Sequence, residues 1–171
     1  MKGKLIGDIL VVKKVPEDID EIVKLPYINR IIKIGHIHGQ KREPEIEMIY
    51  GEGTRTIHKE NYCKYAIDVA KEMWSKGNTG ERLRMSKLPE DNETIIDMFA
   101  GIGYFTIPMA LHSNPKKIYA VEINPNSYNL LCENIKLNKV EDIVEPILGD
   151  CNNQEFDHVA DRIMMGYIGT T

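Results

Sequence analysis

The sequence of 171 residues contains three cysteines, one tryptophan and no long uninterrupted apolar segment. A membrane-spanning helix needs about 20 consecutive apolar residues. A secretory signal needs an apolar core near the N-terminus, where this chain has charges instead, in MKGKLIGDILVVKKV. The cysteines form no CxxC pair, which argues against a zinc ribbon or a disulfide framework. These absences favour a cytoplasmic protein with reduced thiols and no membrane segment.

The charge of the chain is unevenly distributed. Residues 1–87 hold 17 Lys and Arg against 13 Asp and Glu, whereas residues 88–171 hold 5 against 13. A polyanionic partner would therefore bind the first half of the chain.

The pattern of residues 1–56 predicts a small α+β module. Apolar residues alternate in segments 4–14, 28–39 and 43–51, which are bounded by Pro or Gly as short strands are. Segment 15–26 predicts one short helix between the first two strands. His36 and His38 share one face of a strand, but two histidines without a third ligand are weak evidence for metal, and we predict none.

Residues 57–88 are predicted to connect this module to a second domain. Apolar residues recur at helical spacing from His58 to Trp74, which predicts a long connecting helix. The following WSKGNTGERLRMSKL predicts a turn at the end of that helix. The turn would place Ser75 and Arg82 beside whatever the next domain binds.

Residues 89–171 alternate between strand and helix patterns. Buried strands are predicted at ETIIDMFA, KKIYAVEI, DIVEPILGD and DRIMMGYI, with helices at GYFTIPMALHSN and PNSYNLLCENIKLN. Such alternation is typical of a doubly wound parallel sheet. The overall fold class is therefore α/β and Rossmann-like, preceded by the small α+β module.

The strongest local pattern is DMFAGIGYFT, residues 97–106. Gly101 and Gly103 fall where the strand becomes a helix, and glycine there permits positive φ and lets a ligand approach the backbone. Position 106 is Thr, so the full GxGxxG pattern of a dinucleotide site is missing. The segment indicates a nucleotide-type ligand without specifying a pyrophosphate.

Two further strand ends carry acidic residues. Glu122 follows Asp97 by 25 positions and ends the second strand, where a carboxylate accepts hydrogen bonds from both ribose hydroxyls. Its other role would be to cap the next helix, for which Asn124 is better placed. Asp150 could accept from an adenine amino group, and the Cys151 amide could donate to a ring nitrogen. Because no lysine is placed to hold phosphates, S-adenosylmethionine is the best-fitting ligand.

These segments carry a resemblance to known proteins. DMFAGIGYFT, VEINP and GD resemble the class I S-adenosylmethionine-dependent methyltransferases, and the whole chain is similar to the archaeal and eukaryotic proteins that modify guanosine 37 of tRNA. Within that group, TRTIHKENY, WSKGN followed by ERLR, and DMFAGIGYFT most resemble the aminocarboxypropyltransferases of wybutosine synthesis. The resemblance implies an incomplete class I sheet, with about four of seven strands, in a chain that we expect to be truncated at its C-terminus.

The resemblance also implies a reaction and a set of contacts. The 3-amino-3-carboxypropyl group of S-adenosylmethionine would be transferred to C7 of 4-demethylwyosine at position 37 of tRNA-Phe, with release of methylthioadenosine. The implied cofactor contacts are Ser75, Arg82, Asp97, Phe99, Gly101, Gly103, Glu122, Asp150 and Cys151. We assign Ser75 and Arg82 to the methionyl carboxylate, because a guanidinium is a strong charge-assisted donor. A tRNA phosphate contact or a surface ion pair are the other roles open to Arg82.

We expect a monomer that binds tRNA through basic residues of the first half, although many of these would serve only as a solvated face. They are Lys2, Lys4, Lys13, Lys14, Arg30, Lys33, Lys41 and Arg42.

Two other functions remain open at this point. The sister branch methylates N1 of guanosine 37 and ends its fourth strand in an Asn-Leu-Pro or Asn-Pro-Pro-like turn, whereas here the strand runs into GYIGTT. That branch also has a Ser-Pro turn at the position of Ser75 and Lys76. The third alternative is a non-catalytic module that binds tRNA or S-adenosylmethionine.

Overall fold

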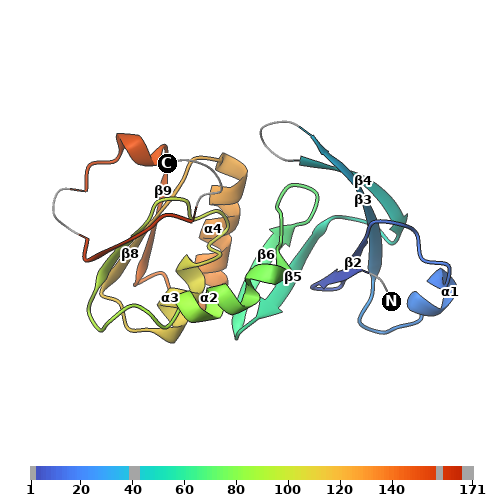
Figure 1. The fold of residues 1–171 in the computed structure, drawn as a ribbon, viewed down its shortest axis with the longest axis horizontal. Coiled ribbons are helices and arrows are strands. Elements are labelled where there is room, and N and C mark those ends of the chain that lie inside the picture. The colour runs from blue at the N-terminus through green and yellow to red at the C-terminus, as the bar shows by residue number, and fades with distance from the viewer. Residues whose placement is uncertain (1–2, 39–42, 157–159, 167–171) are drawn as a thin grey trace. The chain divides into compact units, whose positions relative to one another are not determined.

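The chain divides into two compact units, which are described separately. A computed structural model describes residues 3–38, 43–156 and 160–166, without the side chains of 36–38, 43 and 44 (Figure 1). Unit 1 comprises Met1–Lys59 and Ala66–Lys76, and unit 2 comprises Glu60–Tyr65 and Gly77–Thr171. No helix in the described residues is long and apolar enough to cross a membrane.

Unit 1 contains a four-stranded mixed sheet in the order β1-β2-β3-β4. Its elements are β1 (Lys4–Ile6), β2 (Ile9–Val12), α1 (Ile19–Ile22), β3 (Arg30–His38) and β4 (Glu43–Tyr50). The predicted strands and the short helix are confirmed, except that segment 4–14 forms two antiparallel strands rather than one. The reversal occurs at Gly7, whose φ of +56° is a conformation that side chains rarely adopt.

One face of this sheet is covered by the short helix. Leu10 and Val12 of β2 and Ile31 of β3 pack with Ile22 of α1 and with Ile28. Strand β2 pairs in parallel with β3, and α1 is the crossover between them. The unit therefore has a small apolar core of its own, as an α+β module requires.

The predicted long helix from His58 to Trp74 is wrong. The segment instead forms a two-stranded hairpin of β5 (Arg55–Glu60) and β6 (Cys63–Asp68). Asn61 and Tyr62 at its turn have φ of 50° and 63°, which is the backbone pattern of a tight two-residue hairpin loop. The helical stripe was misleading because Tyr62, one of its members, is 97% exposed at the turn.

A second difference lies just after the hairpin. The basic segment predicted as a turn contains a short 3-10 helix, η1 (Lys76–Asn78), followed by α2 (Thr79–Met85). Two glycines in this stretch suggested a turn, but Gly80 lies inside α2, where a Cβ atom would meet no atom outside its own helix within 4 Å. Arg82 is therefore presented from a helix.

Unit 2 contains a parallel sheet in the order β10-β7-β8-β9. Its elements are β7 (Thr94–Asp97), α3 (Thr106–His112), β8 (Lys117–Glu122), α4 (Pro125–Asn138), β9 (Val144–Leu148), the 3-10 helix η2 (Cys151–Asn153) and β10 (Arg162–Met164). The predicted strands and helices of this region are confirmed. The Ile and Val side chains of β7 and β8 are buried on both faces of the sheet.

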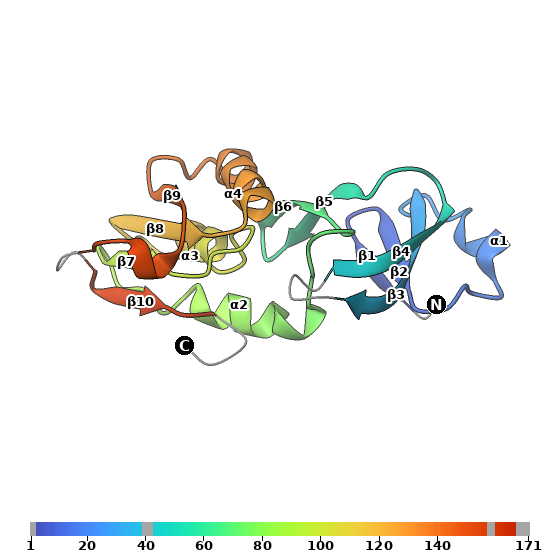
Figure 2. The same cartoon turned by 90° about the horizontal axis from the view of Figure 1, so that it is seen from above.

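Helices α3 and α4 lie on the same side of this sheet (Figures 1 and 2). The two crossovers, β7-α3-β8 and β8-α4-β9, run in the same direction across the sheet, so right-handed connections put both helices on one face. The chain then returns to β10 on the far side of β7. This reversal of strand order beside β7 is where open α/β sheets bind their ligands.

The start of α4 follows from its sequence. Asn124 is the N-cap and its Oδ1 accepts the Asn126 amide at 3.0 Å, while Pro125 occupies the first turn. The helix ends at Lys139, which adopts the left-handed conformation with φ 58°. The prediction that Asn124, and not Glu122, caps this helix is confirmed.

Candidate functional site

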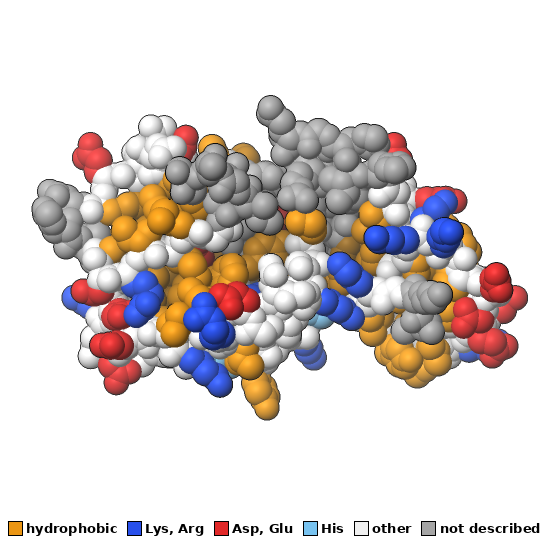
Figure 3. All heavy atoms as spheres, in the orientation of Figure 1, with side chains coloured by type: hydrophobic (Ala, Val, Ile, Leu, Met, Phe, Trp, Pro, Cys, Tyr) orange, Lys and Arg blue, Asp and Glu red, His pale blue; other side chains and the backbone are white. Residues whose placement is uncertain are grey.

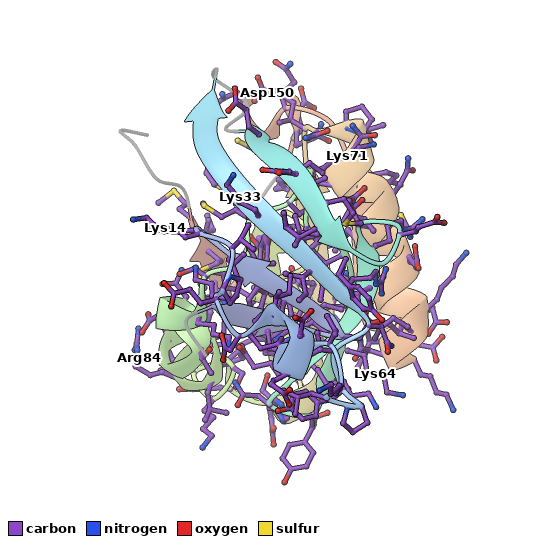
Figure 4. The ribbon with its side chains drawn as sticks, turned by 90° about the vertical axis from the view of Figure 1, so that its right-hand side faces the viewer. Lys14, Lys33, Lys64, Lys71, Arg84 and Asp150 are labelled. Carbon is purple, nitrogen blue, oxygen red and sulfur yellow. The ribbon has the colours of Figure 1, made fainter. Side chains whose placement is uncertain are left out.

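The carboxyl ends of three neighbouring strands bring the predicted acidic residues to one edge of the sheet. Asp97 ends β7, Glu122 ends β8, and Asp150 follows β9 by two residues. Because parallel strands share one carboxyl edge, the three lie at the same edge. Figure 4 shows Asp150 at this end of the unit and Lys64 at the opposite end.

The loop between β7 and α3 is fixed to the neighbouring strands through its amides. The Met98 amide donates to the Met164 carbonyl of β10 at 3.0 Å. The Ala100 amide donates to the Val121 carbonyl of β8 at 2.9 Å. The loop thus bridges the sheet at the point where the strand order reverses.

Both predicted glycines of this loop have positive φ, 57° at Gly101 and 92° at Gly103. A Cβ at Gly103 would lie 2.8 Å from Ile107 Cγ1 and 3.1 Å from Leu131 Cδ1. Glycine at 103 is therefore required both by the backbone conformation and by the close packing of the loop on α3 and α4. Contact of these glycines with a cofactor remains a prediction.

Asp97 is buried and holds the loop from inside. Its Oδ2 accepts the Thr106 hydroxyl at 2.7 Å and its Oδ1 accepts the Phe99 amide at 3.3 Å. Burial raises the pKa of the Asp97 carboxyl to about 6; the two hydrogen bonds act against this rise and the charge of Glu122 adds to it. Asp97 thus closes the loop between its first residue and the start of α3.

Glu122 joins the loop to the end of β8. Its Oε2 accepts the Gly101 amide at 2.8 Å and its Oε1 accepts the Asn124 amide at 2.7 Å. Each carboxylate oxygen has two acceptor positions, so both oxygens keep capacity for another donor. A pair of ribose hydroxyls fits this requirement, because both can donate to a single half-buried carboxylate.

Asp150 lies at the start of η2. Its Oδ1 accepts the Asn152 amide at 2.9 Å, which makes it the cap of this short helix. Among the described residues no other donor to this carboxylate is recorded. The geometry leaves Asp150 able to accept from an adenine amino group, and the half-buried Cys151 follows it directly. Both adenine contacts remain predictions.

Arg82 of α2 lies in a buried ion pair within unit 2. Its side chain is 3% exposed, so an ion pair on the surface is excluded. Its Nε donates to Glu60 Oε1 at 2.6 Å and its Nη2 to Glu60 Oε2 at 3.0 Å, a two-pronged contact with the hairpin. This pairing ties α2 to the hairpin, and contact of Arg82 with the methionyl carboxylate remains a prediction. Ser75 belongs to unit 1, and its predicted contact with the methionyl carboxylate is not addressed by the geometry of unit 2.

Comparison with known proteins agrees with this arrangement. Residues 56–171 match the family model described as the TRM5/TYW2 methyltransferase domain. The chain belongs to this family. It is 49% identical to the tRNA(Phe) (4-demethylwyosine(37)-C(7)) aminocarboxypropyltransferase of Methanocaldococcus jannaschii, over all of this chain and 70% of that protein.

Two further relatives place the chain within the TRM5/TYW2 family. The tRNA (guanine(37)-N(1))-methyltransferase Trm5b of the same organism is 37% identical, over 94% of this chain and 49% of that protein. The crystal structure of M. jannaschii TYW2 in complex with AdoMet superposes with a TM-score of 0.78 at 44% identity. That comparison covers 98% of this chain and 65% of the crystallised one. The fold class of unit 2 is thereby confirmed as that of class I methyltransferases.

Three residues that hold the loop between β7 and α3 were missed in the sequence. They are Thr106, which donates to Asp97; Asn134, which donates to the Ile102 carbonyl at 2.9 Å; and Tyr65, which donates to the Tyr104 carbonyl at 3.4 Å. Tyr65 was hidden by the wrong helix prediction. Asn134 had a signal, because it is a polar residue inside the apolar stripe of Leu131 and Ile135.

Proposed function

We propose that the chain transfers the 3-amino-3-carboxypropyl group of S-adenosylmethionine to C7 of 4-demethylwyosine at position 37 of tRNA-Phe. The observation that carries the proposal is the 49% identity over the whole chain to an aminocarboxypropyltransferase, against 37% to a guanosine-37 N1-methyltransferase of the same organism. A crystallised relative named for its complex with AdoMet has the same fold.

The described side chains suit the adenosyl part of S-adenosylmethionine. Glu122 would hold the two ribose hydroxyls, and Asp150 with the Cys151 amide would hold adenine. The positive φ of Gly101 and Gly103 lets the ligand lie close to the loop backbone. Phe99 in the same loop, Ser75 of unit 1 and Arg82 of α2 are further proposed contacts.

The sulfonium group activates several carbons, and the nucleophile reacts with the one that lies in line with it. Attack of C7 on the γ-carbon of the amino-acid arm forms a C–C bond and breaks the C–S bond, whose electron pair remains on sulfur. Methylthioadenosine leaves, and the proton on C7 is lost to water. The orientation of the amino-acid arm relative to the methyl group therefore decides the reaction, because it determines which carbon faces the base.

We propose that unit 1 makes the contacts with tRNA. We also propose that the protein is a cytoplasmic monomer. Figure 3 shows several Lys and Arg side chains on the face of unit 1 in view, and Lys14 points away from the ribbon in Figure 4. Lys4, Lys13 and Lys14 are exposed. Arg30 and Lys33 instead pair with Asp8 and Glu47, and Lys2, Lys41 and Arg42 lie outside the described residues. In this scheme residues 1–56 bind tRNA, 57–88 connect, and 89–171 bind the adenosyl group.

The deciding experiment uses tRNA lacking the modification and S-adenosylmethionine labelled in its carboxyl group. Retention of the label on tRNA, together with methylthioadenosine as the second product, supports amino-acid-arm transfer. A methylated base with S-adenosylhomocysteine, and no label on tRNA, contradicts it and favours the N1-methyltransferase. Residues 167–171, whose sequence YIGTT argued against methylation, lie outside the described residues. The labelling result is therefore what distinguishes amino-acid-arm transfer from N1-methylation.

A further inference from the structure

Asn134 of α4 reaches the middle of the loop between β7 and α3, which we call the glycine loop. The residue is fully buried, and its Nδ2 donates to the Ile102 carbonyl oxygen at 2.9 Å. A buried side-chain amide is unfavourable unless it forms hydrogen bonds. Here the bond is made to a loop residue 32 positions earlier, between the two glycines. Asn134 is therefore a direct link between α4 and the centre of the loop.

The backbone on both sides of Ile102 has little intrinsic preference. Gly101 and Gly103 have φ of 57° and 92°, and glycine occupies positive and negative φ about equally. The peptide planes next to Ile102 are therefore not fixed by the residues that form them. Hydrogen bonds to these peptide groups therefore select one orientation.

The bond from Asn134 is one of the hydrogen bonds that make this selection. The Ile102 carbonyl and the Gly103 amide belong to one peptide plane, so holding the carbonyl also sets the direction of the amide. The Gly103 amide points in the opposite direction within this plane and donates to the Ala100 carbonyl at 2.8 Å. One residue before Ile102, the Gly101 amide donates to Glu122 Oε2 at 2.8 Å.

We propose that Asn134 is a positioning residue for S-adenosylmethionine, because it holds the loop in the conformation that brings the Gly101 amide to Glu122. The inference rests on the proposed function, since it takes Glu122 and this loop as the adenosyl site. Asn134 itself does not touch the ligand. It acts through the Ile102 carbonyl and, through the loop, on the orientation of the ribose-binding carboxylate.

Asn138, one turn further along α4, is a matched control. Its side-chain amide exchanges two hydrogen bonds with the Lys64 backbone, Oδ1 accepting at 2.9 Å and Nδ2 donating at 2.7 Å, and Nδ2 also donates to the backbone carbonyl of Asn134 at 2.7 Å. Lys64 lies at the opposite end of the unit from Asp150 (Figure 4). Asn138 thus holds the hairpin to the same helix with the same chemistry, but it has no bond to the glycine loop.

The test compares Asn134→Asp with Asn138→Asp in calorimetric binding of S-adenosylmethionine, below the melting temperature of every variant. Asn134→Asp keeps the size of the side chain and loses the donor, and we expect about tenfold weaker binding, as for the loss of one net hydrogen bond. Asn138→Asp should stay within about twofold of the native protein. Lowering the pH from about 8 to about 6 should narrow the Asn134→Asp deficit relative to the native protein, because a protonated carboxyl group can again donate to Ile102.

Equal losses in the two variants, or native affinity in Asn134→Asp, would overturn the proposal. If Asn134→Asp is unfolded at the assay temperature, Asn134→Ser is measured against Asn138→Ser by the same criteria. A native protein that binds S-adenosylmethionine but transfers no amino-acid arm contradicts the proposed function and leaves the Asn134 comparison valid. A native protein that does not bind S-adenosylmethionine overturns both.

Discussion

Glu122 and Gly101 are joined by a hydrogen bond of 2.8 Å that connects the end of β8 to the loop after β7. The same carboxylate accepts the Asn124 amide at the start of α4. One side chain thus ties together two strand ends and one helix. The ribose position proposed for S-adenosylmethionine depends on the orientation of this carboxylate.

Replacement of Glu122 tests that dependence directly. Glu122→Gln replaces one acceptor oxygen with a donor, so it loses one backbone bond and one of the two proposed ribose bonds. We expect binding of both S-adenosylmethionine and methylthioadenosine to weaken by about 10- to 100-fold, measured by calorimetry. Glu141→Gln, at an exposed position after α4, is the control and should bind both ligands normally. Native affinity in Glu122→Gln would show that Glu122 does not bind the ribose.

The buried carboxyl of Asp97 predicts a specific pH dependence of stability. Its pKa is raised from 3.8 to about 6 in the folded state, so between these values the folded protein binds more protons than the unfolded one. The contribution of Asp97 is therefore most favourable below about pH 4 and is lost as the pH rises through about 6. A shift of this size corresponds to about 3 kcal/mol of unfolding free energy.

The measurement is urea unfolding of the native protein and Asp97→Asn from pH 4 to pH 7. The stability of the native protein relative to Asp97→Asn should decrease as the pH rises through this range. The comparison with the variant is needed because Asp8 and Glu93, whose pKa values are lowered, contribute a pH dependence of opposite sign. A difference that does not vary with pH would show that Asp97 titrates normally.

Local sequence was sufficient to predict the strand-helix order of unit 2. Apolar β-branched runs mark β7 and β8, and Asn124 with Pro125 marks the start of α4, so each element is encoded by its own residues. The bond from Asn134 to Ile102 and the pair of Arg82 with Glu60 join residues 32 and 22 positions apart. Such contacts depend on tertiary packing, and no local pattern specifies them.

The hairpin shows how a local pattern can also mislead. Tyr62 has helical spacing to its apolar neighbours, yet its φ is 63° at a tight turn. Because a side chain in the left-handed region costs about 1 kcal/mol, Tyr62→Gly should raise the free energy of unfolding by up to about that amount. Tyr62→Val, a β-branched residue at the same positive φ, should lower it. Thermal unfolding of the two variants checks the prediction, and destabilisation of both would show that the Tyr62 ring, which contacts His112, matters more than its backbone.

The pair formed by Arg82 and Glu60 separates a structural role from a ligand-binding one. Arg82→Ala leaves the Glu60 carboxylate, whose side chain is 10% exposed, without its charged partner, and we expect a loss of about 3 to 5 kcal/mol in the free energy of unfolding. The double variant Glu60→Gln with Arg82→Met should recover most of that loss, since no isolated charge remains. Arg84→Ala, which removes an exposed ion pair with Glu81, should cost less than about 1 kcal/mol.

Binding of the two ligands provides the second readout for Arg82. If the double variant is stable and binds S-adenosylmethionine and methylthioadenosine with native affinities, Arg82 is structural. A stable double variant that loses affinity for S-adenosylmethionine alone would show instead that Arg82 reads the methionyl carboxylate.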